Sequence, residues 1–432
     1  MSCLASDAAA LARAGPPRSR LRDGRRMTAL SDADTRQGTP GEVLLAFLKL
    51  GLTCFGGPVA HIGYFRQAFV ERRHWLDETS YADLVALCQF LPGPASSQVV
   101  FSLGLMRGGW LGGLAASAGF TLPSAIAMVL FAYVAEDMSG PLGLGILHGL
   151  KLVAVAIVSQ AVWGMAISLC PDRTRAGIAL LALAVVTAAG GAAGQIAAIL
   201  LGACAGALLC QGAAPTATGR LPLIPVSRTA GVSLMIAFAV LLVVPPVLLA
   251  GVARSQGLAL FEAFYRSGAL VFGGGHVVLP LLREAVVTPG WVTPDAFLAG
   301  YGAAQSMPGP LFTFAGYLGA VMGPSPNGIA GAAVALVAIF LPGLLLVAGV
   351  LPFWDAFRRR PAAQAAMRGT NAAVVGILGA ALYNPVWTSA VNGPRDFAIA
   401  AAGFVLLVVW RLPPLAVVAA ITVVTAGLYV VT

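Results

Sequence analysis

The chain of 432 residues is strongly apolar: 58% of its residues are hydrophobic, 10% are charged, and the mean hydropathy is +0.86. This composition leaves too little polar surface to cover a water-soluble globule, which excludes soluble enzymes and soluble binding domains. The formal net charge of +9 is carried by arginine, since Lys49 and Lys151 are the only lysines. Arginines between apolar runs orient a membrane protein, so this charge does not indicate a nucleic-acid partner.

Apolar runs follow one another from residue 42 to the C-terminus, and most are long enough to cross about 30 Å of hydrocarbon. None alternates apolar and polar residues with period two, which excludes a membrane barrel and predicts helices. We therefore predict an all-α polytopic protein embedded in lipid, with about thirteen transmembrane segments. The runs are 42–69, 81–105, 109–135, 142–169, 176–190, 193–211, 229–252, 258–286, 295–321, 326–352, 368–388, 396–410 and 412–431.

The sequence contains an internal repeat. FLKLGLTCFGG at 47–57 matches FYRSGALVFGG at 264–274. Farther along, Pro92-Gly93-Pro94 matches Pro308-Gly309-Pro310, and HGLKLVAVAIV at 148–158 matches RGTNAAVVGIL at 368–378. The apolar part of the chain is therefore predicted to consist of two related halves.

Counting the segments predicts how the halves are arranged. Six segments per repeat and one connecting helix put the second repeat into the membrane in the opposite orientation, as inverted repeats. Arg-rich loops are typical of the cytoplasmic side, which predicts a cytoplasmic N-terminus in the inner (plasma) membrane. The predicted regions are an Arg-rich cytoplasmic tail over 1–40, a first repeat over 41–212, a linker with a connecting helix over 213–257, and a second repeat over 258–432.

Arg72 and Arg73 leave an alternative open for the first segments. Both arginines would lie outside if 42–69 simply crosses the membrane. They would lie inside if this run is a re-entrant hairpin broken at Gly56-Gly57-Pro58. Two hairpins and two crossings leave all later segments on the same sides, so spanning and re-entry both remain open for 42–69 and 81–105.

Two runs in each half are interrupted by Gly/Pro motifs that cannot continue a helix. A half-helix that starts after such a break presents unpaired N–H groups and a positive dipole end, which suits an anion near the midplane. Close packing or kinks are the alternative explanation, but four breaks at matching places favour a binding site. The predicted site positions at the breaks are Gly56, Gly57, Pro58, Pro92, Gly93, Pro94, Gly273, Gly274, Pro308, Gly309 and Pro310.

Basic and polar side chains flank the breaks. Lys49 matches Arg266 and Arg66 matches Arg283 across the repeat, and a buried cation beside helix N-termini is typical of an anion site. Snorkelling from a segment end is the alternative for these cations. Lys151, matched by Asn371, is either an asymmetric site residue or a helix-end charge. The predicted neutral donors are Gln89, Ser96, Ser97, Gln98 and Gln305.

Other chemistry is sparse in the sequence. His61, His276 and Asp83 are the residues that we consider for proton coupling. The six cysteines form no CxxC motif, so we expect them to pack rather than bind metal, and we expect no cofactor. HExxH, GxSxG and clustered carboxylates do not occur in the apolar runs, which predicts a transporter rather than an intramembrane enzyme.

The stretch from Phe47 to Gln98, with FGGP, HWLD at 74–77, Gln89 and Pro92-Gly93-Pro94, resembles the chromate ion transporter family, specifically its long two-domain members. FGGGHVVLPLL in the second half also resembles the family pattern. The resemblance extends over nearly all of 42–432 and leaves out the first forty residues. The second half departs from the first: Gly275 replaces Pro58, and Phe312 and Phe314 replace Ser96 and Gln98. If only one half binds substrate, we therefore expect the first.

The resemblance implies export of chromate from the cytoplasm, driven by the proton motive force and conferring chromate resistance. Tetrahedral shape and charge do not separate chromate from sulfate, so uptake of sulfate or another oxyanion is the alternative. We expect the small anion and membrane lipid as partners, with monomer and homodimer both open.

Overall fold

The computed structural model describes residues 38–55, 57–136, 140–211, 226–251, 255–272, 275–357 and 360–431. These residues are helical, with no strand among them, which confirms the all-α class. Five helices in this part of the chain are long and apolar enough to cross a membrane: Ala95–Ala135, Pro141–Leu169, Arg228–Gly251, Gly328–Phe353 and Pro361–Ala390. The protein is thus a multi-pass membrane protein, whereas the count of thirteen segments stays a prediction. Most of the predicted tail at 1–40 and of the linker after residue 211 lies outside the described residues.

The first half begins with short helices and continues with long ones. Its helices are α2 (Pro40–Thr53), α3 (Gly57–Phe65), the π-helix η1 (Arg66–Arg72), α4 (Glu78–Phe90), α5 (Ala95–Glu136), α6 (Pro141–Leu169), α7 (Arg173–Ala189) and α8 (Gly191–Leu209). Non-helical dihedrals at Gly108 and Gly109 divide α5 into a short first part and a long second part. Asp77 caps α4, and hydrogen bonds from Thr79 and Ser80 hold the pKa of its carboxyl at about 2.

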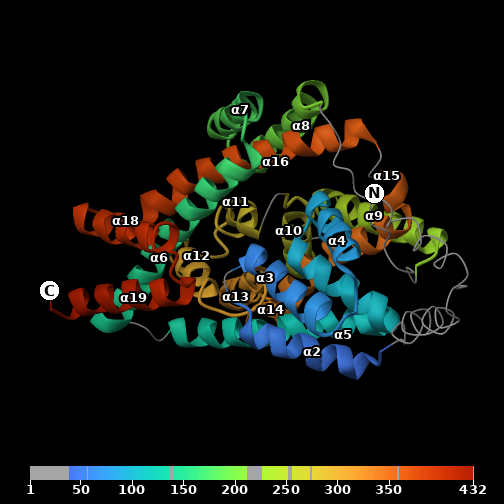
Figure 1. Cartoon of the computed structure of the whole chain (residues 1–432). Coiled ribbons are helices and arrows are strands. Elements are labelled where there is room, and N and C mark those ends of the chain that lie inside the picture. The colour runs from blue at the N-terminus through green and yellow to red at the C-terminus, as the bar shows by residue number, and fades with distance from the viewer. Residues whose placement is uncertain are drawn as a thin grey trace, which may run out of the picture. The chain divides into compact units, whose positions relative to one another are not determined.

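A connecting helix, α9 (Arg228–Gly251), leads to the second half. The helices of that half are α10 (Gln256–Ala269), η2 (Gly275–Val277), α11 (Val278–Val286), α12 (Pro294–Ala304), η3 (Leu311–Thr313), α13 (Phe314–Val321), α14 (Gly328–Val350), η4 (Leu351–Phe353), α15 (Trp354–Phe357), α16 (Pro361–Ala381), η5 (Leu382–Trp387), α17 (Thr388–Ala390), α18 (Pro394–Val408) and α19 (Pro414–Val431). Helix α6 of the first half lies alongside α16, α18 and α19 of the second (Figure 1).

The first two apolar runs of the first half are hairpins rather than single crossings. The rings of Phe47 in α2 and Phe69 in η1 lie 4.7 Å apart, so the chain returns beside the helix by which it entered. Arg107 forms an ion pair with Glu42, at 3.4 Å, and its guanidinium lies 5.2 Å from the centre of the Trp75 ring. The start of α2, the loop before α4 and the end of the short part of α5 therefore meet at one place, which we call the Trp75 end. Each of the runs 42–69 and 81–105 therefore folds back as a helical hairpin, and their re-entry into the membrane stays a prediction.

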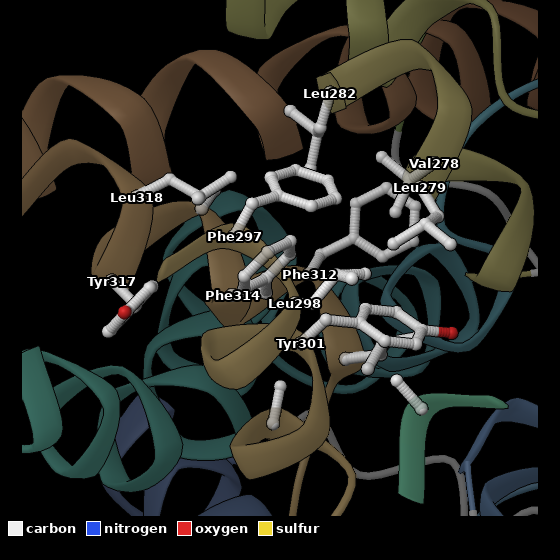
Figure 2. Close-up of a cluster of buried hydrophobic side chains, with 14 of the residues drawn as sticks. Val278, Leu279, Leu282, Phe297, Leu298, Tyr301, Phe312, Phe314, Tyr317 and Leu318 are labelled. Carbon is white, nitrogen blue, oxygen red and sulfur yellow. The ribbon is translucent and has the colours of Figure 1, made fainter. Parts of the chain in front are cut away.

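The second half repeats this arrangement. Gly257 at the start of α10 faces Pro326, and the Gly323 N–H donates to the Trp291 carbonyl at 3.0 Å. Figure 2 shows the close packing of these hairpins, with Leu282 of α11 directed toward Phe297 of α12, whose ring lies 5.2 Å from that of Phe314 in α13. The entry and exit of both hairpins meet at what we call the Trp291 end.

The Trp75 and Trp291 ends lie at opposite ends of one long helix. Arg107 precedes the long part of α5, whereas Tyr133 near its other end faces Gly328 at the start of α14. From Trp110 to Tyr133 an α-helix rises about 35 Å, close to the thickness of a membrane core. The hairpins of the two halves therefore enter from opposite ends of α5.

Substitution of Gly309 by alanine tests how tightly the two halves are packed. Its φ is +92°, and an added Cβ would lie 2.9 Å from Ser124 Oγ and 3.1 Å from the Phe120 carbonyl oxygen in α5. We expect Gly309→Ala to destabilise the protein by more than the 1–3 kcal/mol or so that an unfavourable φ costs. The measurement is the apparent Tm of the detergent-solubilised protein.

Gly190→Ala is the matched control, because Gly190 has a φ of +62° and an added Cβ would meet no atom within 4 Å. Backbone strain acts in both variants, whereas contact with α5 acts only at Gly309. Equal decreases in Tm would contradict close packing between the halves at this position.

Candidate functional site

The four breaks meet halfway along the long helices, where each half completes the other. The Gly93 N–H donates to the Val271 carbonyl at 2.7 Å, and the matching Gly309 N–H donates to the Cys54 carbonyl at 2.9 Å. Cys54 and Val271 are themselves equivalent in the repeat. The two hydrogen bonds thus join the Pro-Gly-Pro break of each half to the glycine break of the other, and we call this place the junction.

Packing against α5 and α14 places the junction near the middle of these two long helices. Gly309 faces Ser124 of α5, and Gly93 faces Gly343 of α14, which is the counterpart of Ser124 in the repeat. Ser124 lies about midway along the long part of α5, and Gly343 lies past the middle of α14. Gly93 has a φ of +120°, which is rarely adopted by residues with a side chain.

Gln98 holds the first Pro-Gly-Pro break in place. Its side chain is fully buried, and its Nε2 donates to the Pro92 carbonyl at 2.9 Å and to the Gly343 carbonyl at 3.1 Å. The second of these bonds again joins the two halves. The structure therefore uses the amide of this predicted donor for a contact within the protein.

The start of α5 presents backbone donors at the junction. The Gln98 N–H bonds to the Pro94 carbonyl at 3.0 Å and closes the first helical turn. The N–H groups of Ser96 and Ser97 come before this turn, so they have no acceptor within the helix. Both serines are buried, at 4% exposure. This arrangement of N–H groups and positive helix dipole suits an anion.

Several buried polar atoms near the breaks have no hydrogen-bond partner among the described residues. They are Ser97 Oγ, Gln98 Oε1 and Gln305 Nε2. An unsatisfied buried donor or acceptor costs about 1–3 kcal/mol, so such atoms call for a ligand or water. Gln89, the counterpart of Gln305, is instead exposed on α4.

The first-half cations are not buried at the junction. Lys49 is exposed, because α2 buries the opposite face with Val43, Ala46 and Phe47. Arg66 is also exposed and pairs with Glu71 at 2.6 Å and with Glu78 at 2.7 Å. The expectation of buried cations is therefore wrong for both residues.

The second-half cations lie at cavities. Arg266 pairs with Glu262 at 2.9 Å and lines a small cavity together with Gln195. Arg283 lines a neighbouring cavity of about 520 Å³, which Gln195 also borders. The Arg283 Nε is buried and has no partner among the described residues. Among the four matched cations, only the second-half pair lines cavities, whereas the expectation favoured the first half.

Some of the remaining predicted positions lie at the junction, some lie elsewhere, and some lie outside the described residues. Gly57 begins α3, and Pro308 and Pro310 flank Gly309 at the junction. His276 Nδ1 lies 2.7 Å from the Tyr301 hydroxyl, and Asp83 is buried on α4. Gly56, Gly273 and Gly274 lie outside the described residues, as does the side chain of Pro58.

Sequence reasoning missed a second polar cluster. His148 lies 3.0 Å from Asp396, and Lys151 lies 2.6 Å from Asp295, beside a cavity of about 500 Å³. The partners are 248 and 144 residues apart in the chain, so no local spacing connects them. The available signal was the presence of charged residues near the starts of apolar runs.

Comparison of the sequence with known proteins identifies one family. The model of the chromate transporter family matches residues 41–209 and 258–428, once in each half. The chain belongs to the chromate transporter family. The chromate transport protein of Pseudomonas aeruginosa is 30% identical over 89% of this chain and 92% of its own length. The chromate transport protein of Cupriavidus metallidurans is 26% identical over 82% of this chain and 84% of its own length. An uncharacterized transporter of Methanocaldococcus jannaschii is 24% identical over 73% of this chain and 77% of its own length. No solved structure matches the chain.

Proposed function

We propose that this protein is a secondary transporter that exports chromate from the cytoplasm, driven by the proton motive force, and so confers chromate resistance. The family match over both halves carries the proposal, together with full-length similarity to proteins named for chromate transport. The junction adds a physical reason, since helices broken at mid-depth are typical of binding sites in secondary transporters.

The proposed topology is an inverted repeat in the inner membrane, with the Trp75 end in the cytoplasm. Two observations support it. The hairpins of the two halves enter from opposite ends of α5. The connecting helix α9 starts where Gly231 faces Gly349 near the end of α14, and it leads to α10 at the opposite end. In this arrangement Arg72, Arg73 and Arg107 lie on the side where basic residues are enriched.

The proposed substrate site is the junction. The N–H groups of Ser96 and Ser97 and the unpartnered Ser97 hydroxyl lie at the start of α5, and the unpartnered Gln305 amide follows α12 of the other half. A tetrahedral dianion accepts hydrogen bonds from several directions and is stabilised by helix N-termini. Relative movement of the halves about the junction would then expose the site to each side in turn.

Transport into everted membrane vesicles tests the function. Vesicles energised by respiration are expected to accumulate radiolabelled chromate, and an uncoupler is expected to abolish the accumulation because it removes the proton gradient. Vesicles without the protein are the control. No accumulation in vesicles that hold a verified gradient would contradict export, and competition by excess sulfate would show how far the site separates the two dianions.

Ser97 tests the location of the site. We expect Ser97→Ala to raise the KM for chromate by about ten- to hundredfold, because one hydrogen bond to a charged group contributes about 1.5–3 kcal/mol. Its hydroxyl has no partner among the described residues, so Tm should change little. Ser102→Ala is the control, because it also removes a buried hydroxyl from α5, at a position farther from the break. Equal effects of the two variants on KM would contradict a site at the start of α5.

Cysteine labelling tests the topology. Arg72 is exposed at the end of η1, and Thr288 is exposed in the loop after α11, so each marks the end of the first hairpin of its half. In a variant lacking the six native cysteines, we expect Arg72→Cys to react with an impermeant maleimide in everted vesicles and Thr288→Cys to react in intact spheroplasts. Labelling of both positions from the same side would contradict the inverted arrangement.

A further inference from the structure

Two ion pairs join the halves of the protein around one cavity. His148 and Lys151 lie on α6 of the first half, one turn apart. Their partners belong to the second half: Asp396 lies in the first turn of α18, and Asp295 lies in the first turn of α12. The cavity of about 500 Å³ is lined by His148, Lys151 and Asp295, and it borders Tyr317, Asn392 and Tyr429.

The cavity connects buried groups to the Trp291 end. The side chain of Asp295 is 72% exposed, whereas that of Lys151 is 15% exposed and that of His148 is 8% exposed. Helices α6, α12 and α18 all begin here, and Ala132 and Ala135 from the end of α5 line the same cavity. In the proposed topology this end faces the outside.

The pair of His148 and Asp396 has the parts of a proton-binding site. The His148 Nε2 lies 3.0 Å from Asp396 Oδ1, and the other carboxylate oxygen accepts the Asn392 N–H at 2.9 Å. The backbone donor keeps the carboxylate oriented, and a histidine bonded to a carboxylate is a group suited to the transfer of protons. The charged and titratable groups nearby are Lys151 on the same helix, Asp295 on α12, Tyr317 on α13 and Tyr429 on α19. The ring of Tyr429 lies 5.6 Å from the ring of His148.

The other histidines considered for proton coupling lack a comparable partner in the described part of the chain. His61 is fully buried between the rings of Phe65 and Phe120 and lies beside no carboxylate among the described residues that contact it. The His276 Nδ1 lies beside the hydroxyl of Tyr301. A histidine beside a carboxylate at the mouth of a cavity is better suited to exchange protons with water.

We propose that His148 and Asp396 bind the external proton whose inward movement drives export, and that the neighbouring pair of Lys151 and Asp295 positions α6 against α12. The proposal rests on the proposed export function. Because His148 and Asp396 belong to different halves, protonation of His148 strengthens their attraction, and loss of the proton weakens it. The charge of this pair thereby changes the relative stability of the two arrangements of the halves.

The test measures proton movement and substrate exchange separately in proteoliposomes. An internal pH dye reports protons that move with a chromate gradient, and exchange of labelled for unlabelled chromate reports substrate transport without net proton movement. His148→Gln and Asp396→Asn are expected to reduce proton movement by about tenfold or more and to leave exchange within about twofold of the wild type. Asp172→Asn is the matched control, because Asp172 caps α7 in an exposed ion pair with Arg175 and asparagine caps equally well.

Each result separates this proposal from the proposed function. Wild-type protein without chromate exchange would overturn the function itself. Wild-type exchange without proton movement would overturn the proton coupling in the proposed function and this assignment with it. Undiminished proton movement in His148→Gln and Asp396→Asn would overturn only the assignment of the proton site. If both variants lose exchange and proton movement together, with Tm unchanged, the pair belongs to substrate transport. That result would also overturn the assignment of the proton site.

Discussion

The architecture depends on the need to satisfy backbone hydrogen bonds where helices are broken at mid-depth. Hydrocarbon offers no partner for a free N–H or C=O group, so each break must be completed by the protein. The bonds from Gly93 to Val271 and from Gly309 to Cys54 meet this need, and each joins one half to the other. Gln98 adds a third bond of the same kind, to the carbonyl of Gly343. The halves are therefore mutually dependent at the place where we locate the substrate.

The class of fold could be predicted from the sequence because the necessary information is local. Apolar runs, Gly/Pro breaks and the repeat are all visible along the chain, and the breaks lie where expected. Re-entry was left open because parity cannot distinguish a hairpin from a crossing. The hairpin shape of these runs follows from the contacts of Trp75 with Arg107 and of Trp291 with Gly323, which depend on three-dimensional packing.

The candidate site was harder to predict, because side-chain partners depend on which helix face is buried. Lys49 was expected to be buried because it flanks a break and matches Arg266, yet Ala46 and Phe47 fix the buried face of α2 on the other side. Arg66 was matched with Arg283 by the repeat, but Glu71 and Glu78 are present only in the first half and form ion pairs with Arg66 at the surface. His148 and Asp396 are joined only by the packing of α6 against α18.

The exchanged hydrogen bonds at the junction have a consequence for biosynthesis. The first half leaves the ribosome before the second exists, so the Cys54 carbonyl and the Gly93 amide have no partner at that stage. Their partners follow roughly two hundred residues later, which at about 5–20 residues per second means a delay of about 10–40 s. During this interval the first hairpins must stay hydrated, remain near the membrane surface or be held by the insertion machinery. Complete insertion of the first half is therefore expected to await synthesis of the second.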